Sequence, residues 1–283
     1  MTKRLGIFGY PLDHSLSPVF QQAALDSLEI DATFASWPTP PEELAEAVDG
    51  LRADDCLGCC ITLPHKQAAL ELVDELDPAA EEIGAINTIV NDGGRLKGYN
   101  TDAQGFLRGL REAAGFEPEG RSVLVVGAGG AARAIAFALR GAGVSRLTIA
   151  NRTEERAESL AKDLTRGRFR PDALSLEVDR LANAAPYADL IVNATSMGMT
   201  GGSATEQTPV PPELISGSTL CYDAVYAPSM TPFLQASEDA GARIAGGLAM
   251  LIYQGAEGFK LWTGRDAPVE VMFDAARVAL PEE

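Results

Sequence analysis

Apolar and polar residues form blocks along this chain whose lengths suit strands and helices in turn. The clearest block is residues 123–126, an apolar Val-Leu-Val-Val run that breaks into Gly127, Gly129 and Gly130 and then resumes at helical spacing. This pattern predicts a buried strand, a tight turn and a helix. A further strand follows at residues 146–150, so the block indicates a strand-helix-strand unit.

The first hundred residues show the same alternation, which indicates an α/β architecture. Strands are predicted at residues 5–8, 33–37 and 59–63, with helices beginning at Ser17 and at Pro41. Ser17 followed by Pro18 predicts a serine N-cap and a proline as the first helical residue. Residues 85–90 and 95–99 are typical of a strand pair that turns at Asn91-Asp92-Gly93-Gly94.

The remaining elements follow from the same periodicity. We expect a linker helix at residues 102–114 that closes at Gly115, and strands at Leu190 and at residues 220–222. Apolar helix patterns occupy residues 247–263 and 269–279. Periodicity alone does not assign these terminal helices to one domain or another.

The glycine turn predicts a dinucleotide site. Gly127 can adopt the backbone angles of the turn, Gly129 lets a diphosphate approach the main chain, and Ala132 permits close packing of helix on strand. The first amides of the helix that begins near Gly130 would face the phosphates.

The end of the following strand favours NADP over NAD. A carboxylate there would bind a ribose diol, whereas this chain has Asn151-Arg152-Thr153 with Arg156 close by, a set that suits an added phosphate. In the alternative interpretation Thr153 only caps the helix at residues 154–164, and the arginines are solvated charges. Both can hold, because a capping threonine can also donate its hydroxyl to a phosphate.

Composition excludes several classes of protein. The 283 residues suffice for two domains, and the net charge of −17 argues against a nucleic-acid surface. No apolar run approaches the ~20 residues that span a bilayer, so we expect a cytoplasmic protein with no membrane partner. Cys56 and Cys59 are spaced C-x-x-C, but no second ligand pair has zinc-site spacing; we interpret all four cysteines as buried reduced thiols and expect no metal.

Polar side chains follow several predicted strands and helix starts. Ser15 and Ser17 can direct two hydroxyls to one point beside the positive end of a helix, which suits a carboxylate, although capping alone also selects serine there. Thr62 and Lys66 lie just beyond a strand, where α/β proteins concentrate ligand contacts. The pKa of a lysine, unlike that of an arginine, can be tuned, yet Lys66 also fits a surface lysine in a helix's first turn.

Two further motifs place polar side chains at strand boundaries. Asn87 and Asp102 each lie at a strand boundary, and Asp102 could pair with Lys66 in a cleft and exchange protons with it. The alternative role of Asp102 is an early helix residue that the helix dipole favours. The sequence spacing does not show that the two side chains meet.

Together these motifs resemble the shikimate dehydrogenase family over almost the whole chain. The resemblance rests on the order and spacing of Ser-Leu-Ser-Pro at 15–18, Thr62, Pro64 and Lys66, Asn87-Thr88, Asn100-Thr101-Asp102, Gly-Ala-Gly-Gly at 127–130, Asn151-Arg152-Thr153, Asn-Ala-Thr-Ser-Met-Gly at 193–198, Asp223 with Tyr226, Thr-Pro-Phe-Leu at 231–234, and Gly247, Met250, Leu251 and Gln254.

The resemblance implies an N-terminal α/β substrate domain (residues 1–102 and 247–283), a Rossmann-type NADP domain (residues 103–246), and an active site in the cleft between them. It implies interconversion of shikimate and 3-dehydroshikimate, with Lys66 and Asp102 as the catalytic pair. The implied substrate-binding residues are Ser15, Ser17, Thr62, Lys66, Asn87, Asp102, Tyr226 and Gln254. The implied cofactor-binding residues are Gly127, Ala128, Gly129, Gly130, Ala131, Asn151, Arg152, Thr153, Arg156, Ala224 and Gly247.

Two positions depart from the family pattern. Cys60 stands where an asparagine usually precedes the catalytic lysine, and Gln22 stands where family members often have asparagine. The alternatives are a quinate/shikimate dehydrogenase, an aminoshikimate dehydrogenase and a non-catalytic NADP(H)-sensing module. Serine at both 15 and 17, together with Arg152, favours shikimate with NADP over quinate with NAD. The oligomeric state is open, with a homodimer among the options.

Overall fold

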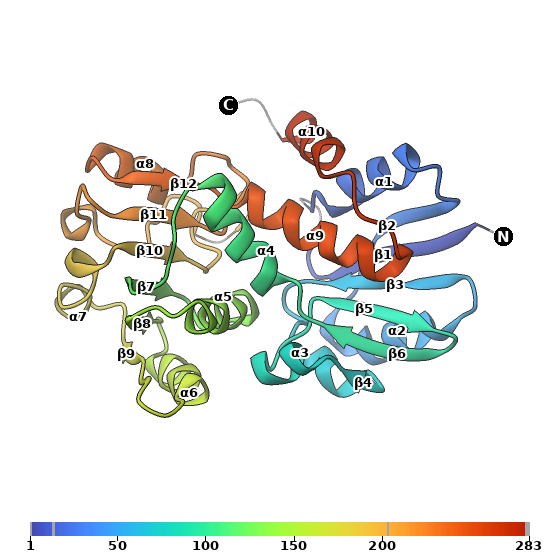
Figure 1. The fold of residues 1–283 in the computed structure, drawn as a ribbon, viewed down its shortest axis with the longest axis horizontal. Helices are drawn as coiled ribbons and strands as arrows, with labels where there is room; N and C mark the ends of the chain where they lie inside the picture. The colour runs from blue at the N-terminus through green and yellow to red at the C-terminus, as the bar shows by residue number, and fades with distance from the viewer. Residues whose placement is uncertain (1, 13–14, 203, 281–283) are drawn as a thin grey trace. The chain divides into compact units, whose positions relative to one another are not determined.

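The computed structural model of the chain describes residues 2–12, 15–202 and 204–280. The chain forms two compact units (Figure 1). Unit 1 comprises Met1–Gly105 and Ile252–Glu283, and unit 2 comprises Phe106–Leu251. The divisions fall within the helices α4 (Asp102–Arg108) and α9 (Leu248–Thr263).

Unit 1 is built on a mixed six-stranded sheet in the order β2-β1-β3-β5-β6-β4. Its strands are β1 (Lys3–Gly9), β2 (Ala32–Pro38), β3 (Cys56–Ile61), β4 (Glu75–Leu76), β5 (Thr88–Asp92) and β6 (Arg95–Tyr99). Strands β2, β1 and β3 are parallel, whereas β5 pairs antiparallel with both β3 and β6. The carboxyl ends of the three parallel strands therefore lie at one edge of the sheet.

Helices cover this sheet and bury its apolar side chains. They are α1 (Ser17–Ser27), α2 (Leu44–Asp49), α3 (Pro78–Ile83), the C-terminal part of α9 and α10 (Val269–Ala279). Leu44 and Val48 of α2 pack with Ile61 and Ile89 of the sheet in one apolar core. Elsewhere α1 packs on α10, and Trp262 of α9 donates its indole N–H to the carbonyl oxygen of Ile89 at 2.9 Å.

Unit 2 is a parallel six-stranded sheet in the order β12-β11-β10-β7-β8-β9, visible from top to bottom in Figure 1. Its strands are β7 (Ser122–Val126), β8 (Arg146–Ala150), β9 (Asp172–Leu174), β10 (Leu190–Asn193), β11 (Leu220–Asp223) and β12 (Arg243–Ala245). Its helices are α5 (Gly130–Gly141), α6 (Glu154–Leu164), α7 (Val178–Leu181) and α8 (Pro232–Asp239), besides the parts of α4 and α9 within the unit. This strand order is that of a dinucleotide-binding Rossmann fold, with its switch point between β7 and β10.

The predicted α/β fold is confirmed, and most elements lie where the apolar pattern placed them. Several features differ. The short strands β4, β9 and β12 and the helices α3 and α8 were not predicted. At α1, Leu16 rather than Ser17 is the N-cap, because the Leu16 carbonyl oxygen accepts the first helical bonds, from the amides of Val19 and Phe20 at 3.0 and 3.2 Å.

Strand β3 spans Cys56–Ile61 rather than the predicted residues 59–63, and it contains a β-bulge. The register between β1 and β3 shifts between the pairs Arg4–Cys56 and Leu5–Gly58. Gly58 has a φ of +141°, and a Cβ there would lie 2.0 Å from the carbonyl oxygen of Ile89. The bulge therefore requires glycine.

We expect Gly58→Ala to lower the free energy of unfolding by about 2 kcal/mol or more, because it combines a strained φ with a backbone clash. Urea unfolding followed by circular dichroism measures the change. Gly50→Ala is the matched control, because Gly50 has a helical φ of −61° and no atom within 4 Å of a Cβ. A Gly58→Ala variant as stable as Gly50→Ala would contradict the assigned role of the bulge.

Candidate active site

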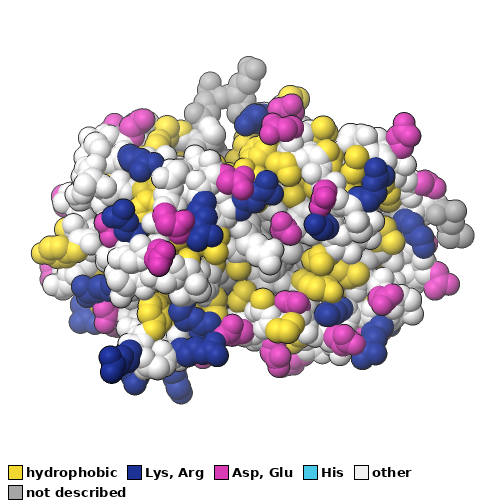
Figure 2. Space-filling model, viewed as in Figure 1, with side chains coloured by type: hydrophobic (Ala, Val, Ile, Leu, Met, Phe, Trp, Pro, Cys, Tyr) yellow, Lys and Arg dark blue, Asp and Glu magenta, His cyan; other side chains and the backbone are white. Residues whose placement is uncertain are grey.

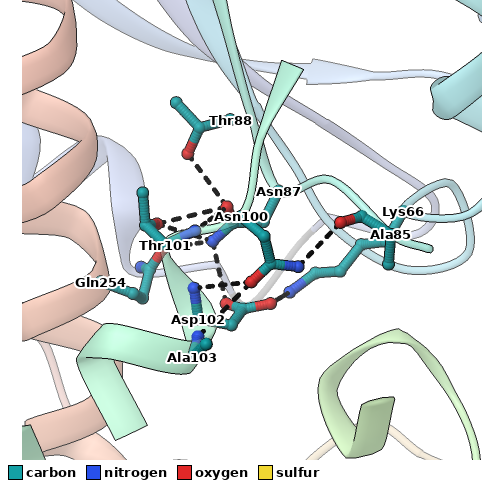
Figure 3. Close-up of polar contacts among 9 residues, drawn as sticks. All are labelled: Lys66, Ala85, Asn87, Thr88, Asn100, Thr101, Asp102, Ala103 and Gln254. Atoms are coloured by element: carbon teal, nitrogen blue, oxygen red, sulfur yellow. Dashed lines mark hydrogen bonds and ion pairs between the residues drawn. The ribbon is translucent and has the colours of Figure 1, made fainter. Parts of the chain in front are cut away.

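A buried polar network in unit 1 brings together residues from four parts of the chain (Figure 3). Lys66 follows β3, Asn87 precedes β5, Asp102 is the first residue of α4, and Gln254 lies on α9. Lys66 Nζ donates to Asp102 Oδ2 at 2.5 Å. The two side chains retain only 14% and 5% of their exposure, so the pair is shielded from water on most sides.

Asn87 is the centre of the network. Its Nδ2 lies within hydrogen-bond distance of Asp102 Oδ1 at 2.9 Å, Thr101 Oγ1 at 2.9 Å and Gln254 Oε1 at 3.1 Å. An amide nitrogen has two hydrogens, so these three acceptors share them. Asn87 Oδ1 accepts from the amide of Thr101 at 2.8 Å and from Thr88 Oγ1 at 3.1 Å. The asparagine thus orients the carboxylate that holds Lys66.

The backbone around the network is fixed by the β5–β6 hairpin and by Asn100. The Asn87 amide donates to the Tyr99 carbonyl oxygen at 3.0 Å, which places Asn87 beside the start of α4. Asn100 Oδ1 accepts from the Asp102 amide at 3.1 Å, and its Nδ2 donates to the Ala85 carbonyl oxygen at 2.9 Å. Asn100 and Thr101 are absent from the predicted site residues. An asparagine directly before the predicted helix at residue 102 is the signal that could have identified the capping bonds of Asn100.

Cys60 lies close enough to Lys66 and Asp102 for their charges to act on its thiol. Burial is the larger influence and raises the pKa of Cys60 to about 12. The thiol is therefore neutral at neutral pH and adds no charge beside the ion pair. All four cysteines are buried free thiols, as predicted, and the described residues contain no cluster of His, Cys, Asp or Glu that could hold a metal ion.

The other predicted substrate residues are distributed over both units. Ser15 and Ser17 lie at the start of α1 in unit 1, where Ser15 Oγ accepts from the Ser17 amide at 3.4 Å. Thr62 is half-buried in the loop after β3. Tyr226 is half-buried in unit 2, in the loop after β11.

The glycine turn of unit 2 has the predicted geometry. Gly127 has a φ of +120°, and a Cβ there would lie 2.9 Å from the Ala194 carbonyl oxygen, so the turn requires glycine. A Cβ on Gly129 would meet no atom within 4 Å, which leaves open space beside the main chain. Gly129 is the N-cap of α5, whose first turn follows the switch point of the sheet. Open space beside amides at a helix start suits a diphosphate.

The end of β8 carries the predicted cationic groups. Asn151 Nδ2 donates to the Thr153 carbonyl oxygen at 2.8 Å, and Thr153 is the N-cap of α6 without a side-chain capping bond. Arg152 and Arg156 are exposed, and neither forms an ion pair with any described carboxylate. Figure 2 shows Lys and Arg side chains gathered at its lower left, over the place of α6 in Figure 1. The guanidinium groups of Arg152 and Arg156 could hold a phosphate on an otherwise acidic protein.

A second buried network ties the loops after β10 and β11. Asp223 Oδ1 accepts from Asn193 Nδ2 at 3.0 Å and from the Val225 amide at 2.9 Å, and Thr231 Oγ1 donates to Oδ2 at 2.6 Å. Burial raises the pKa of Asp223 to about 6, against the opposing effect of these donors.

Gly247 lies against the loop that Asp223 fixes. Its amide donates to the Val225 carbonyl oxygen at 3.2 Å, and a Cβ on Gly247 would lie 2.3 Å from the Ala224 carbonyl oxygen. The two predicted cofactor residues Ala224 and Gly247 are therefore neighbours.

Unit 2 has the Rossmann-type sheet and the phosphate-suited turn of a dinucleotide-binding domain, and unit 1 holds a buried lysine–aspartate pair that can move a proton. Together these features indicate a nicotinamide-dependent dehydrogenase. Three family models match the chain: the shikimate dehydrogenase substrate binding domain at residues 7–89, shikimate / quinate 5-dehydrogenase at residues 112–200, and the shikimate 5'-dehydrogenase C-terminal domain at residues 247–277. The chain belongs to the shikimate dehydrogenase family.

Individual relatives agree over nearly the full length. A shikimate dehydrogenase (NADP+) from Moorella thermoacetica is 45% identical, with 99% of this chain and 94% of that protein covered. The crystal structure of the Thermus thermophilus shikimate 5-dehydrogenase with NADP(H) and shikimate is 41% identical, with a TM-score of 0.87 and coverage of 98% and 100%. A quinate dehydrogenase from Corynebacterium glutamicum with NAD is 31% identical, with a TM-score of 0.86 and coverage of 97% and 98%. Among the described residues, no helix has the length and apolarity to cross a membrane.

The raised pKa of Asp223 makes stability depend on pH. As the pH rises from about 4 to about 6, the unfolded state loses this proton before the folded state does, so the folded state is progressively penalised. Asp223→Asn removes this titration. We expect the unfolding free energy of the variant, relative to the parent, to increase by roughly 1 kcal/mol between pH 5 and pH 7.5.

Paired urea titrations at the two pH values measure this difference. Ser237→Ala is the control, because it removes another buried hydrogen bond of unit 2, from Ser237 Oγ to the Phe233 carbonyl oxygen at 2.7 Å, without removing a carboxyl group. A constant difference between Asp223→Asn and the parent at both pH values would contradict the assignment.

Proposed function

We propose that this chain interconverts shikimate and 3-dehydroshikimate with NADP, as a step in the biosynthesis of chorismate and the aromatic amino acids. The buried Lys66–Asp102 pair is the observation that carries the proposal. A lysine held by a carboxylate is a group that can take and return a proton. A protein that only senses NADP(H) has no need of such a pair.

Lys66 is the proposed acid and base. During oxidation neutral Lys66 accepts the proton of the substrate hydroxyl, and during reduction the ammonium returns it. Asp102 Oδ2 holds Lys66 Nζ in place, at 2.5 Å. Asn87 donates to the other carboxylate oxygen and so prevents Asp102 from rotating away.

The remaining polar groups orient the ring. We assign the Ser15 and Ser17 hydroxyls to the substrate carboxylate, because they lie at the start of α1 where the helix dipole favours an anion. Thr62, Asn87, Tyr226 and Gln254 are assigned to the ring and its hydroxyls. Fixing both ends of the ring supplies much of the rate acceleration by orientation alone.

The residues of unit 2 fit NADP. The open space beside Gly129 and the helix start at Gly130 suit the diphosphate. The guanidinium groups of Arg152 and Arg156, which have no carboxylate partner in the described part of the chain, suit the 2′-phosphate. We assign the cofactor to Gly127, Ala128, Gly129, Gly130, Ala131, Asn151, Arg152, Thr153, Arg156, Ala224 and Gly247. When bound, NADP supplies the hydride chemistry of the reaction.

The assignment gives each unit one task. Most of the substrate residues belong to unit 1, whose residues 7–89 match the substrate binding domain model, with Tyr226 of unit 2 as the exception, and the cofactor residues belong to unit 2. We propose a cytoplasmic location, because the four free thiols are typical of a protein in a reducing compartment. A homodimer is also proposed, and sedimentation tests it.

The function is tested by absorbance of the reduced nicotinamide, with shikimate and quinate each combined with NADP and NAD. Rapid reduction of the nicotinamide only in the mixture of shikimate and NADP supports the proposal. Preferred use of quinate or NAD would favour the activity named for the Corynebacterium glutamicum relative. No reaction in any mixture, with NADP bound, would favour another ring substrate or a sensor.

Lys66→Ala should lower kcat by roughly 10²–10⁴-fold, because it removes the acid and base. Lys66→Arg should be similarly impaired, since arginine keeps the charge but does not release its proton. NADP affinity, measured by nucleotide fluorescence, should not change. Lys260→Ala is the control, because Lys260 pairs with Asp266 at 2.7 Å on the exposed surface. Parent-like turnover by Lys66→Ala would refute the assigned role.

Arg152→Asp should shift the cofactor preference toward NAD, because a carboxylate repels the 2′-phosphate and can bind a ribose diol. We expect the ratio of kcat/KM for NADP to that for NAD to fall by roughly 10-fold or more. Arg277→Asp makes the same charge change in unit 1 and should leave the ratio unaltered. If Arg152→Asp keeps the parent preference, the phosphate is bound elsewhere.

A further inference from the structure

His65 is a buried histidine that the proposed reaction does not use. It directly precedes Lys66 and is 1% exposed. Its Nε2 lies 2.7 Å from the carbonyl oxygen of Thr39. Because a carbonyl oxygen only accepts, Nε2 carries the hydrogen of this bond.

Lys66 lies in an irregular loop between β3 and residue 68, so no helix or strand fixes its backbone. Several main-chain bonds hold this loop. The Ile86 amide donates to the Lys66 carbonyl oxygen at 2.8 Å, the His65 amide to that of Thr62 at 2.9 Å, and the Thr62 amide to that of Phe8 at 2.8 Å. The His65 ring adds a side-chain bond that joins this loop to Thr39, directly after β2.

The acceptor of that bond is itself firmly held. Thr39 follows β2 and is 3% exposed. Its amide donates to the Gly9 carbonyl oxygen at the end of β1 at 2.9 Å, and its hydroxyl donates to the Trp37 carbonyl oxygen at 2.8 Å. The Tyr10 amide, directly after β1, donates to the Leu63 carbonyl oxygen at 3.0 Å. The loops after β1, β2 and β3 are therefore linked to one another.

We propose that His65 is a positioning residue for the reaction: its bond to the Thr39 carbonyl oxygen fixes the loop that carries Thr62 and Lys66. This inference rests on the proposed function. Without the bond, the Thr39 oxygen loses a buried donor and the loop loses its link to β2, so Lys66 Nζ is held less closely on Asp102. A displacement of about 1 Å at a reacting group can lower the rate about 10²-fold.

The length of the side chain gives a sharp test. Glutamine places its amide nitrogen about as far from the backbone as histidine Nε2, whereas asparagine places it about where Nδ1 lies. We expect His65→Asn to lower kcat/KM for shikimate by roughly 10-fold or more and His65→Gln to stay within about 3-fold of the parent. His65→Asn should also shift the pH dependence of kcat, while the KM for NADP stays unchanged. His65→Phe, which keeps a ring but has no donor, should behave like His65→Asn.

Amide hydrogen exchange supplies a readout that does not depend on activity. His65→Asn should speed exchange at Ile86 and Tyr10, whose amides bond to this loop, and leave the unit 2 strand β7 unaltered. Ser237→Ala is the control for loss of a buried bond in unit 2. If the parent does not use shikimate, the proposed function fails, but exchange at Ile86 still tests the role of His65.

Two results would overturn the inference. In the first, His65→Asn and His65→Phe keep the parent kcat/KM, pH profile and Ile86 exchange. In the second, His65→Gln is as impaired as His65→Asn, which would mean that the volume of the ring matters and the donor does not. Should His65→Asn fail to fold, the comparison of His65→Phe with His65→Gln decides between the same two results.

Discussion

The buried contact between Lys66 and Asp102 sets the requirements for the rest of the unit 1 site. Removing two charges from water costs several kcal/mol for each ion, and their attraction offsets this cost only when further hydrogen bonds complete the geometry. Asp102 meets this condition because Lys66 holds one carboxylate oxygen and Asn87 the other. Thr101 and Gln254 in turn fix Asn87. A polar network of this depth is what allows a charged pair to lie 14% and 5% exposed.

Unit 2 meets a different electrostatic problem, because its proposed ligand is an anion and the whole chain carries a net charge of −17. The site suits a phosphate through local groups: free space beside Gly129, amides at the start of α5, and two exposed arginines without carboxylate partners among the described residues. Fixed dipoles and nearby charges act over short range, whereas salt screens the distant acidic residues beyond about 10 Å. The net charge therefore restricts which molecules bind the surface as a whole. Phosphate binding at the glycine turn depends instead on the groups close to it.

The sequence predicted the features that depend on neighbours in the chain. The apolar run before Gly127, the glycine turn and helix α10 follow from local periodicity, and all lie as expected. β9 and β12 were missed because three-residue strands have little pattern of their own and form by pairing with β8 and β11. The contact between Lys66 and Asp102 could only be a hypothesis from the sequence. It depends on the β5–β6 register, which pairs Thr88 with Tyr99 and which the sequence spacing does not show. The role of His65 was not predicted, because a single histidine has no periodic signal.

A common geometric rule explains why widely separated motifs can serve one reaction. In a parallel sheet the carboxyl ends of the strands lie at one edge, and the following loops collect there. In unit 1 the ends of β1, β2 and β3 bring together Ser15, Thr39 and the Thr62–Lys66 loop; in unit 2 the ends of β7, β8 and β11 carry Gly127, Arg152 and Asp223. Loops are otherwise the least rigid parts of a fold, so their precision has to come from bonds between them. The bonds among Gly9, Thr39 and His65, and those around Asp223, supply it, which makes the connections between loops as important to the chemistry as the residues that perform it.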